Sequence, residues 1–196
     1  MKKSLIILII VGLFIFWAIA STVGSYNSII SKNESVKSQW AQVENVYQRR
    51  ADLIPNLVST VKGYADFEKS TLTAVVEARA KATQTKIDAN YLDANKIQQF
   101  RAAQDGLSSA LSKLMVVVEK YPDLKANQNF LELQAQLEGT ENRISVERMK
   151  FNEVTQDYNA YIQKFPTNLF AGMFGFSQKE YFKATVGAEK APEVKF

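Results

Sequence analysis

The stretch IISKNESVKSQWAQVENVYQRRADLIPNLVSTVKGY, residues 29–64, carries the clearest signal of the fold class. Steps of alternately four and three residues along it meet an apolar or aromatic side chain everywhere except at Asn33 and Arg50, which is the seam of a helix packed against other helices. The phase continues through Pro55, which favours one long helix kinked at this proline. The alternative is a break, with Asp52 capping a new helix that has Pro55 in its first turn. The seam consists of Ile29, Asn33, Val36, Trp40, Val43, Tyr47, Arg50, Ile54, Leu57, Val61 and Tyr64.

Three further segments carry one apolar seam each and predict three more helices, over about 67–86, 97–121 and 130–165. The last two end before Pro122 and Pro166, which are stop signals. The connections are short, and strand-like alternation is missing. The sequence therefore predicts an all-α fold: an antiparallel four-helix bundle with long first and fourth helices, preceded by one N-terminal transmembrane helix. The side chains expected to face inward from the second helix are Leu72, Val75 and Val76.

The first and fourth helices are expected to lie antiparallel, with Ile29 opposite Phe165. Arg50 and Glu147 then fall in the core phase at similar heights. One interpretation is a buried ion pair or charged site. The other is that Arg50 extends its head group to solvent while Glu147 lies at the solvated edge. A structural pair is favoured over a catalytic one, because structural ion pairs often resemble functional sites.

The N-terminal segment, residues 5–24, is uncharged and almost entirely apolar. Twenty helical residues cover roughly 30 Å, the thickness of the hydrocarbon core of a bilayer. A secretory signal peptide cleaved after Ala20 is the alternative. The bulky Phe16 and Trp17 crowd that cleavage site, so an uncleaved anchor in the cell membrane is favoured, with the bilayer as a partner of residues 5–24.

Lys2 and Lys3 stand directly before this segment, and the next basic residues are Lys32 and Lys37, with Glu34 between them. The positive-inside rule then favours a single-pass protein with a cytoplasmic N-terminus and an extracytoplasmic bundle. Three parts are expected: an anchor, a helical bundle and an aromatic C-terminal tail. Their ranges are 1–24, 25–166 and 167–196.

The tail after Pro166 is rich in aromatic residues, and its glycines make a helix of more than a turn or two unfavourable. It is expected to begin near the membrane end of the bundle. Two interpretations are open: a cap that folds back on the bundle, which is favoured, or an aromatic hook in the lipid interface. Residues 187–196 are expected to form a mobile, charged, strand-like end.

The composition excludes several kinds of chemistry. Among the 196 residues there is no cysteine and no histidine, which removes disulfides, thiolate or imidazole metal sites, and serine–histidine triads. The net charge is +4, but without Lys2 and Lys3 the chain has 22 basic and 20 acidic residues. A nucleic-acid partner is therefore not expected, and neither a cofactor nor a metal is predicted.

Short motifs recur in order along nearly the whole chain: Tyr26-Asn27, Trp40-Ala41, Arg49–Val58, Val61–Tyr64, Ala78-Arg79, Glu141–Ile144, Tyr158-Asn159, Phe165-Pro166, Asn168-Leu169, Phe174–Phe176, Tyr181-Phe182 and Ala191-Pro192. In these motifs the chain resembles the LemA family. The resemblance implies a small membrane-anchored helical protein without established enzyme activity, and a membrane protein with a TPM-type domain as a partner. It also implies a short N-terminus outside the cell, opposite to the lysine argument, and this conflict stays open.

The function expected from these observations is a membrane-anchored, non-catalytic helical interaction or scaffold module. Charged and amide side chains around Pro55 could contact a protein partner, or could equally be solvated surface and capping residues. The alternatives are a secreted or periplasmic soluble binding domain after cleavage at Ala20, and a carboxylate-based enzyme. Four-helix carboxylate sites normally add histidine, which argues against the enzyme. The candidate structural or interaction residues are Arg49, Arg50, Asp52, Pro55, Asn56, Lys62 and Glu147.

Overall fold

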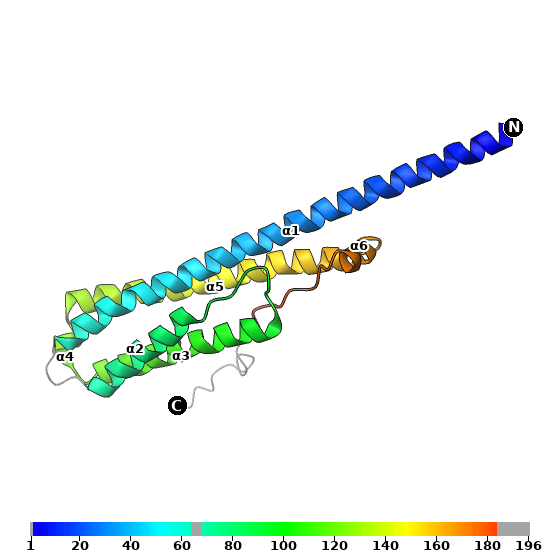
Figure 1. The fold of residues 1–196 in the computed structure, drawn as a ribbon. Helices are drawn as coiled ribbons and strands as arrows, with labels where there is room; N and C mark the ends of the chain where they lie inside the picture. Colours follow the sequence, from blue (N-terminus) through cyan, green and yellow to red (C-terminus); the bar gives the residue numbers. More distant parts are fainter. Residues whose placement is uncertain (1, 64–67, 184–196) are drawn as a thin grey trace, which may run out of the picture.

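The computed structural model describes residues 2–63 and 68–183. Within these residues the chain is helical, without a β-strand (Figure 1), so the all-α prediction is confirmed for them. Tyr64 and the expected start of the second helix at Phe67 lie outside the described residues, as does the stretch 187–196. The helices are α1 (Lys2–Lys62), α2 (Lys69–Gln84), α3 (Ala94–Val118), α4 (Pro122–Lys125), α5 (Gln128–Gln163) and α6 (Thr167–Met173).

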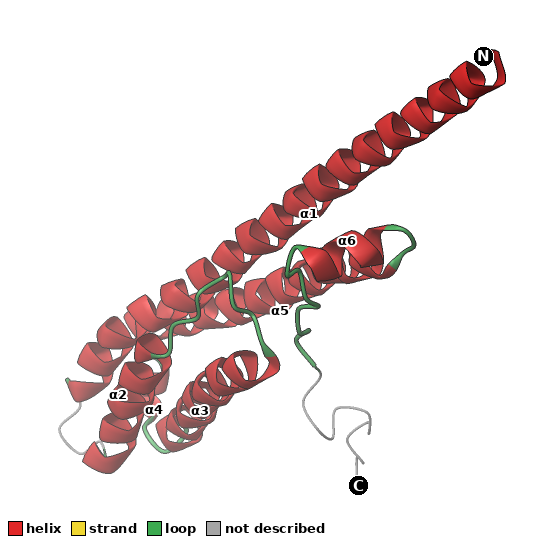
Figure 2. Cartoon of the chain, turned by 45° about the vertical axis from the view of Figure 1, so that its right-hand side comes forward, coloured by secondary structure: helices red, strands yellow, loops and turns green. Residues whose placement is uncertain are grey.

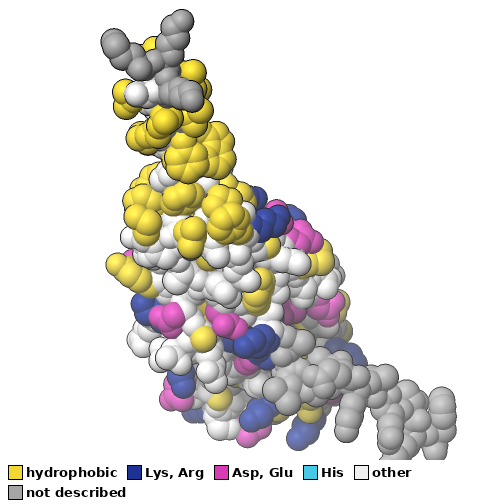
Figure 3. Space-filling model, turned by 90° about the vertical axis from the view of Figure 1, so that its right-hand side faces the viewer, with side chains coloured by type: hydrophobic (Ala, Val, Ile, Leu, Met, Phe, Trp, Pro, Cys, Tyr) yellow, Lys and Arg dark blue, Asp and Glu magenta, His cyan; other side chains and the backbone are white. Residues whose placement is uncertain are grey.

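Helix α1 joins the predicted anchor and the first bundle helix into one element of 61 residues. At 1.5 Å per residue it is about 90 Å long. Its N-terminal part projects from the body, and the large apolar side chains from Leu5 to Val23 are exposed (Figures 1 and 3). The helix also continues through Pro55, so the alternative of a break capped by Asp52 is wrong. Packing of the buried seam on both sides of Pro55 offsets its missing backbone hydrogen bond.

Two helix pairs are closely packed. The C-terminal two thirds of α1 lie antiparallel against α5, and α2 lies against α3 (Figures 1 and 2). Contacts between α1 and α2 are fewer. The four longest helices therefore run side by side as two pairs. A regular four-helix bundle, in which each helix packs equally closely on both of its neighbours, stays a prediction.

The predicted partner of Ile29 is wrong. Ile29 is buried, but α5 ends at Gln163 and Phe165 follows it with 80% of its surface exposed. The seam of α5 ends at Ile162 instead. The reason is that the chain turns toward α6 after the helix ends, which carries Phe165 out of the phase of the seam.

The predicted seams supply most of the buried residues, which form two clusters. The cluster nearer the projecting part of α1 surrounds Trp40, whose ring lies 5.3 Å from that of Phe100 and 5.5 Å from that of Phe151. The second cluster lies toward the far end and includes Leu57 and Phe130. The prediction that Val76 faces inward is wrong. This residue is 48% exposed, because α2 buries only a narrow stripe against its neighbours.

The described part of the tail, residues 167–183, folds back on the helices. Helix α6 has seven residues and ends in a Schellman motif, in which the Phe176 N–H donates to the Ala171 carbonyl at 2.9 Å. Gly175 provides the positive φ of 75° that this motif requires. Beyond it, the Phe182 ring stacks on Trp40 with 5.8 Å between ring centres and is buried. The tail thus becomes part of the core, although α6 itself keeps apolar side chains exposed.

Candidate functional site

The sequence-predicted residues separate into one buried group and several exposed ones. Arg50 is 2% exposed, and Glu147 is partly buried. The remaining candidates are all exposed on α1: Arg49, Asp52, Pro55, Asn56 and Lys62.

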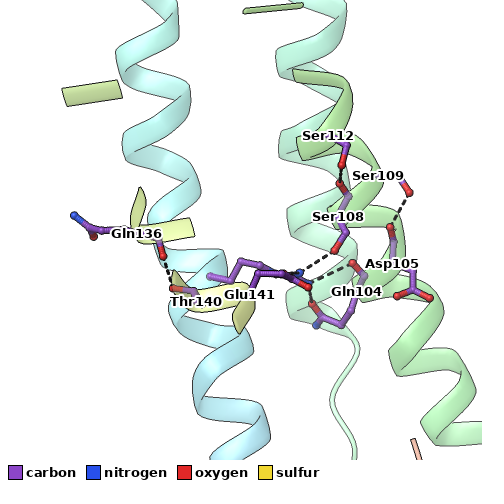
Figure 4. A network of polar contacts seen from close by, with 9 residues as sticks. Gln104, Asp105, Ser108, Ser109, Ser112, Gln136, Thr140 and Glu141 are labelled. Atoms are coloured by element: carbon purple, nitrogen blue, oxygen red, sulfur yellow. Dashed lines mark hydrogen bonds and ion pairs between the residues drawn. The ribbon is translucent and has the colours of Figure 1, made fainter. Parts of the chain in front are cut away.

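Arg50 reaches from α1 to polar side chains of α3 and α5. Figure 4 shows its partners Gln104, Ser108 and Glu141. Its Nη1 donates to Ser108 Oγ and to Glu141 Oε2, both at 2.8 Å. Its Nη2 donates to the side-chain oxygen of Gln104 at 2.8 Å. The Arg50 guanidinium also lies over the ring of Tyr47, 5.1 Å from its centre. One buried cation therefore ties three helices together through directional contacts.

The interpretation that pairs Arg50 with Glu147 is wrong, and so is the alternative in which the Arg50 head group extends to solvent. Arg50 forms its ion pair with Glu141, at a distance of 2.8 Å. Glu147 accepts a hydrogen bond from Gln39 at 2.6 Å and pairs with Lys150 at 2.9 Å. The hydrogen bond from Lys150, followed by that from Gln39, lowers the pKa of the Glu147 carboxyl. The six residues from Glu141 to Glu147 correspond to about 9 Å of helix, so a modest difference in register decides which acid reaches Arg50.

A hollow of about 240 Å³ lies beside the Arg50 cluster, between α1, α2 and the start of α3. Burial raises the pKa of the Glu44 carboxyl, against the opposing effect of the Lys86 ammonium. The hollow thus contains the Glu44 carboxyl group, the Lys86 ammonium group and several neutral hydrogen-bond donors and acceptors. Such a lining suits a polar side chain better than an apolar ligand. Within the described residues no three Asp or Glu gather as metal ligands would. The polar residues that line the hollow are Glu44, Asn45, Gln48, Thr83, Thr85, Lys86 and Gln104.

The exposed candidates do not form a single cluster. With 3.6 residues per turn, Arg49, Asp52 and Asn56 lie within about 60° of arc on α1, whereas Lys62 points about 140° away from Arg49. Asp52 accepts a hydrogen bond from Gln48 at 2.7 Å, which links this exposed face to the hollow. We call the surface formed by Gln48, Arg49, Asp52 and Asn56 the α1 polar face.

Two asparagines that hold the tail, Asn152 and Asn159, were not among the predicted site residues, although Asn159 stands in one of the stretches shared with the family. Asn159 donates to the Lys179 carbonyl at 2.8 Å and accepts from the Lys179 N–H at 2.9 Å. Asn152 does the same with Phe182, with both distances 2.8 Å. These two amide groups hold the tail as a neighbouring β-strand would.

The spacing of the asparagines matches that of the backbone they hold. Asn152 and Asn159 are seven residues apart, about 10.5 Å along a helix. Lys179 and Phe182 are three residues apart, about 10 Å along an extended chain. Two asparagines seven residues apart on one helix could therefore have predicted this contact. The prediction would have required the assumption that an extended segment packs against that helix.

Comparisons with known proteins identify relatives of the chain. The model of the LemA family matches residues 39–196. Magnetosome protein MamQ 2 of Paramagnetospirillum magneticum is 27% identical over 182 residues, which cover 84% of this chain and 67% of that protein. Magnetosome protein MamQ of Magnetospirillum gryphiswaldense is 26% identical, over 80% of this chain and 64% of its own. Protein LemA of Metamycoplasma hominis is 22% identical, over 92% of this chain and 77% of its own. The family match thus includes the Arg50 cluster, the α1 polar face and both asparagines.

Proposed function

Because the chain belongs to the LemA family, and because its helical body continues into an exposed apolar helix, we propose that it is a single-pass membrane-anchored interaction module. Its body contributes no catalysis; it presents the α1 polar face and the adjoining hollow to a protein partner. The single observation that carries this proposal is the continuity of α1 from the apolar segment into the core of the body.

The apolar part of α1 supports the anchor. It is the one helix in the described part of the chain that is long and apolar enough to cross a membrane. None of its large side chains from Leu5 to Val23 is buried in the body, so they contribute nothing to the core. A contiguous apolar surface of this extent calls for an apolar environment.

The same continuity argues for an uncleaved segment. The helix runs through Ala20 without interruption, and the Thr22 hydroxyl donates to the Ala18 carbonyl at 2.8 Å across the cleavage position. In this proposal the anchor is part of the mature protein, and a rigid helix transmits its orientation to the body.

The height of the α1 polar face above the bilayer constrains the partner. With the membrane boundary near Gly24, Arg49 lies about 38 Å and Asn56 about 48 Å further along the helix axis. A partner confined to the bilayer would not reach this surface. The proposed partner is therefore a membrane protein with an extramembrane domain, for which a TPM-type domain is the family-based candidate.

Alkaline carbonate extraction tests the anchor. The full chain is expected to remain in the membrane fraction, whereas a variant with Ile10→Arg and Phe14→Arg should be extracted, because two buried charges make insertion unfavourable. The matched control places the same two arginines at Val116 and Met149, which are exposed on the body, and should stay in the membrane. An intact mass that begins after Ala20 would refute the uncleaved anchor.

Photocrosslinking in membranes tests the interaction surface. A benzophenone amino acid at Asn56 is expected to give one stoichiometric adduct with an integral membrane protein. The control position is Gln136, which is exposed on α5 at a similar height. Equal adducts from both positions, or none from Asn56, would remove the support for the α1 polar face.

A further inference from the structure

Four apolar side chains are exposed together around α6: Phe165, Leu169, Met173 and Phe174. Phe165 is 80% and Met173 77% exposed. The helical ones lie four residues apart, at Leu169 and Met173, and therefore on one face of α6. The opposite face is occupied, because Thr167 and Ala171 are buried against the body. Helix α6 is thus amphipathic, with a packed side and an unpartnered apolar side.

We propose that this apolar side of α6 lies in the lipid interface of the same bilayer that α1 spans. The proposal rests on the proposed membrane anchor and extends it. The bilayer contacts the protein at two places, the spanning helix and the edge of the body beside it. We call the surface formed by Phe165, Leu169, Met173 and Phe174 the α6 apolar edge.

The location of α6 along α1 supports this placement. The ring of Phe174 lies 5.0 Å from that of Tyr26, and the ring of Phe176 lies 5.9 Å from it. Tyr26 is three residues beyond Val23, about 4.5 Å along the helix axis. The α6 apolar edge therefore lies at the level where the apolar segment of α1 ends. Amphipathic helices in membrane interfaces bury their apolar faces about 5–10 Å into the headgroup and acyl boundary.

Charge distribution at this end of the body also fits a lipid surface. Residues 4–31 of α1 and residues 165–178 of the tail contain no charged side chain. The first charges beyond them are basic: Lys32, Lys164 and Lys179. Of these, Lys164 is exposed and Lys32 half-buried, whereas Lys179 is buried with its ammonium over the ring of Tyr158. Lys32 lies over the ring of Tyr161, 5.6 Å from its centre. An uncharged apolar edge bordered by lysines matches the order of acyl chains and phosphate headgroups in a bilayer.

Figure 3 shows hydrophobic side chains that continue from the projecting part of α1 onto the adjoining end of the body. Continuity with the spanning surface favours lipid over a separate protein partner as the occupant. Two contacts instead of one would restrain the tilt of the body on its anchor. The α6 apolar edge would then determine the direction in which the α1 polar face is presented.

Spin labels at single cysteines test the proposal, since the chain contains no cysteine of its own. The full-length protein is reconstituted in vesicles of phosphatidylcholine and phosphatidylglycerol. Three variants are compared: Met173→Cys on the α6 apolar edge, Met149→Cys as an exposed control on α5, and Ile10→Cys in the spanning segment. Collisions with oxygen and with a water-soluble nickel chelate report the depth of each label.

The expected result is a several-fold lower nickel collision rate at Met173→Cys than at Met149→Cys, with Ile10→Cys protected most. Equal nickel access at positions 173 and 149, with position 10 still protected, would overturn the α6 proposal and leave the anchor standing. Nickel access at position 10 would refute the anchor, and the α6 contact with it. A low nickel collision rate at position 173 together with an equally low oxygen collision rate would show that protein, not lipid, covers the edge, because oxygen is enriched among acyl chains; this result also overturns the proposal.

Discussion

Replacing Asn159 by alanine removes both hydrogen bonds with which α5 holds the backbone of Lys179. Each buried hydrogen bond contributes a net 0.5–1.5 kcal/mol, so the pair contributes about 1–3 kcal/mol. Alanine returns roughly 0.5 kcal/mol through its better helix propensity. The free energy of unfolding is therefore expected to fall by about 0.5–2.5 kcal/mol. The same change at Asn142, exposed on the same helix, is the control for propensity.

Hydrogen exchange measures the local effect of this change. The Lys179 amide loses its acceptor, and exchange across residues 177–182 should accelerate, while the core of α5 around Phe151 should exchange as before. The double variant Asn159→Ala, Asn152→Ala should lose less free energy of unfolding than the sum of the two single variants. Once one substitution has released the tail, the second asparagine no longer contributes its hydrogen bonds. This release would also remove Phe182 from its stack on Trp40.

The variant Asn159→Asp tests whether residue 159 holds the tail through its hydrogen bonds or only through the shape of its side chain. The carboxylate has nearly the same size, but it replaces the donor that faces the Lys179 carbonyl with a second acceptor. Loss of the clamp is expected at neutral pH, with recovery in acid as the carboxyl gains a proton that it can donate. Unchanged exchange over residues 177–182 in both the alanine and the aspartate variants would refute the view that the asparagines hold the tail.

Three other changes give separate tests. Burial raises the pKa of the Glu44 carboxyl, so its contribution to stability is present below the unfolded pKa and is lost as the pH rises through the folded pKa. Glu44→Gln should therefore raise the melting temperature at pH 8, and the difference from the unchanged protein should fade toward pH 4. A larger gain in acid would contradict this expectation. Val75→Thr buries a hydroxyl and should lower the free energy of unfolding, measured by chemical denaturation, by about 1–3 kcal/mol. Val76→Thr on the exposed side should change it by less than about 0.5 kcal/mol. Equal losses from the two variants would contradict the burial pattern of α2. A membrane-impermeant maleimide should label Lys125→Cys in intact cells, because the lysines before the span favour an extracytoplasmic body, and labelling only after lysis would reverse this orientation.

The helical seams were predictable because their signal is local. A residue on α1 faces the core when it keeps the phase set by Trp40 and Ile54, and this phase can be counted without knowledge of any neighbour. The apolar segment at residues 5–24 is local in the same sense. The error at Val76 has a related cause: the width of a buried stripe depends on how many helices cover it, which periodicity does not state.

The partners of polar groups were not predictable to the same degree. Arg50 was correctly singled out as a polar side chain in a core phase, but its acid is Glu141 and not Glu147. Helix register has to be known to within about one turn, or 5.4 Å, to choose between such acids. Gln104 and Ser108 join the same cluster from a third helix, so their rotation about α3 matters as well.

The long helices, the apolar stripe of each and the one segment apolar enough to span a membrane can all be predicted from the sequence. Each of these follows from the spacing and hydrophobicity of neighbouring residues along the chain. The return of the tail to Asn152 and Asn159, and the packing of α6 beside Tyr26, are visible only once the chain is folded. Contacts of this kind depend on the relative shift and rotation of segments far apart in sequence, and a displacement of a few ångströms is enough to change every hydrogen-bond partner.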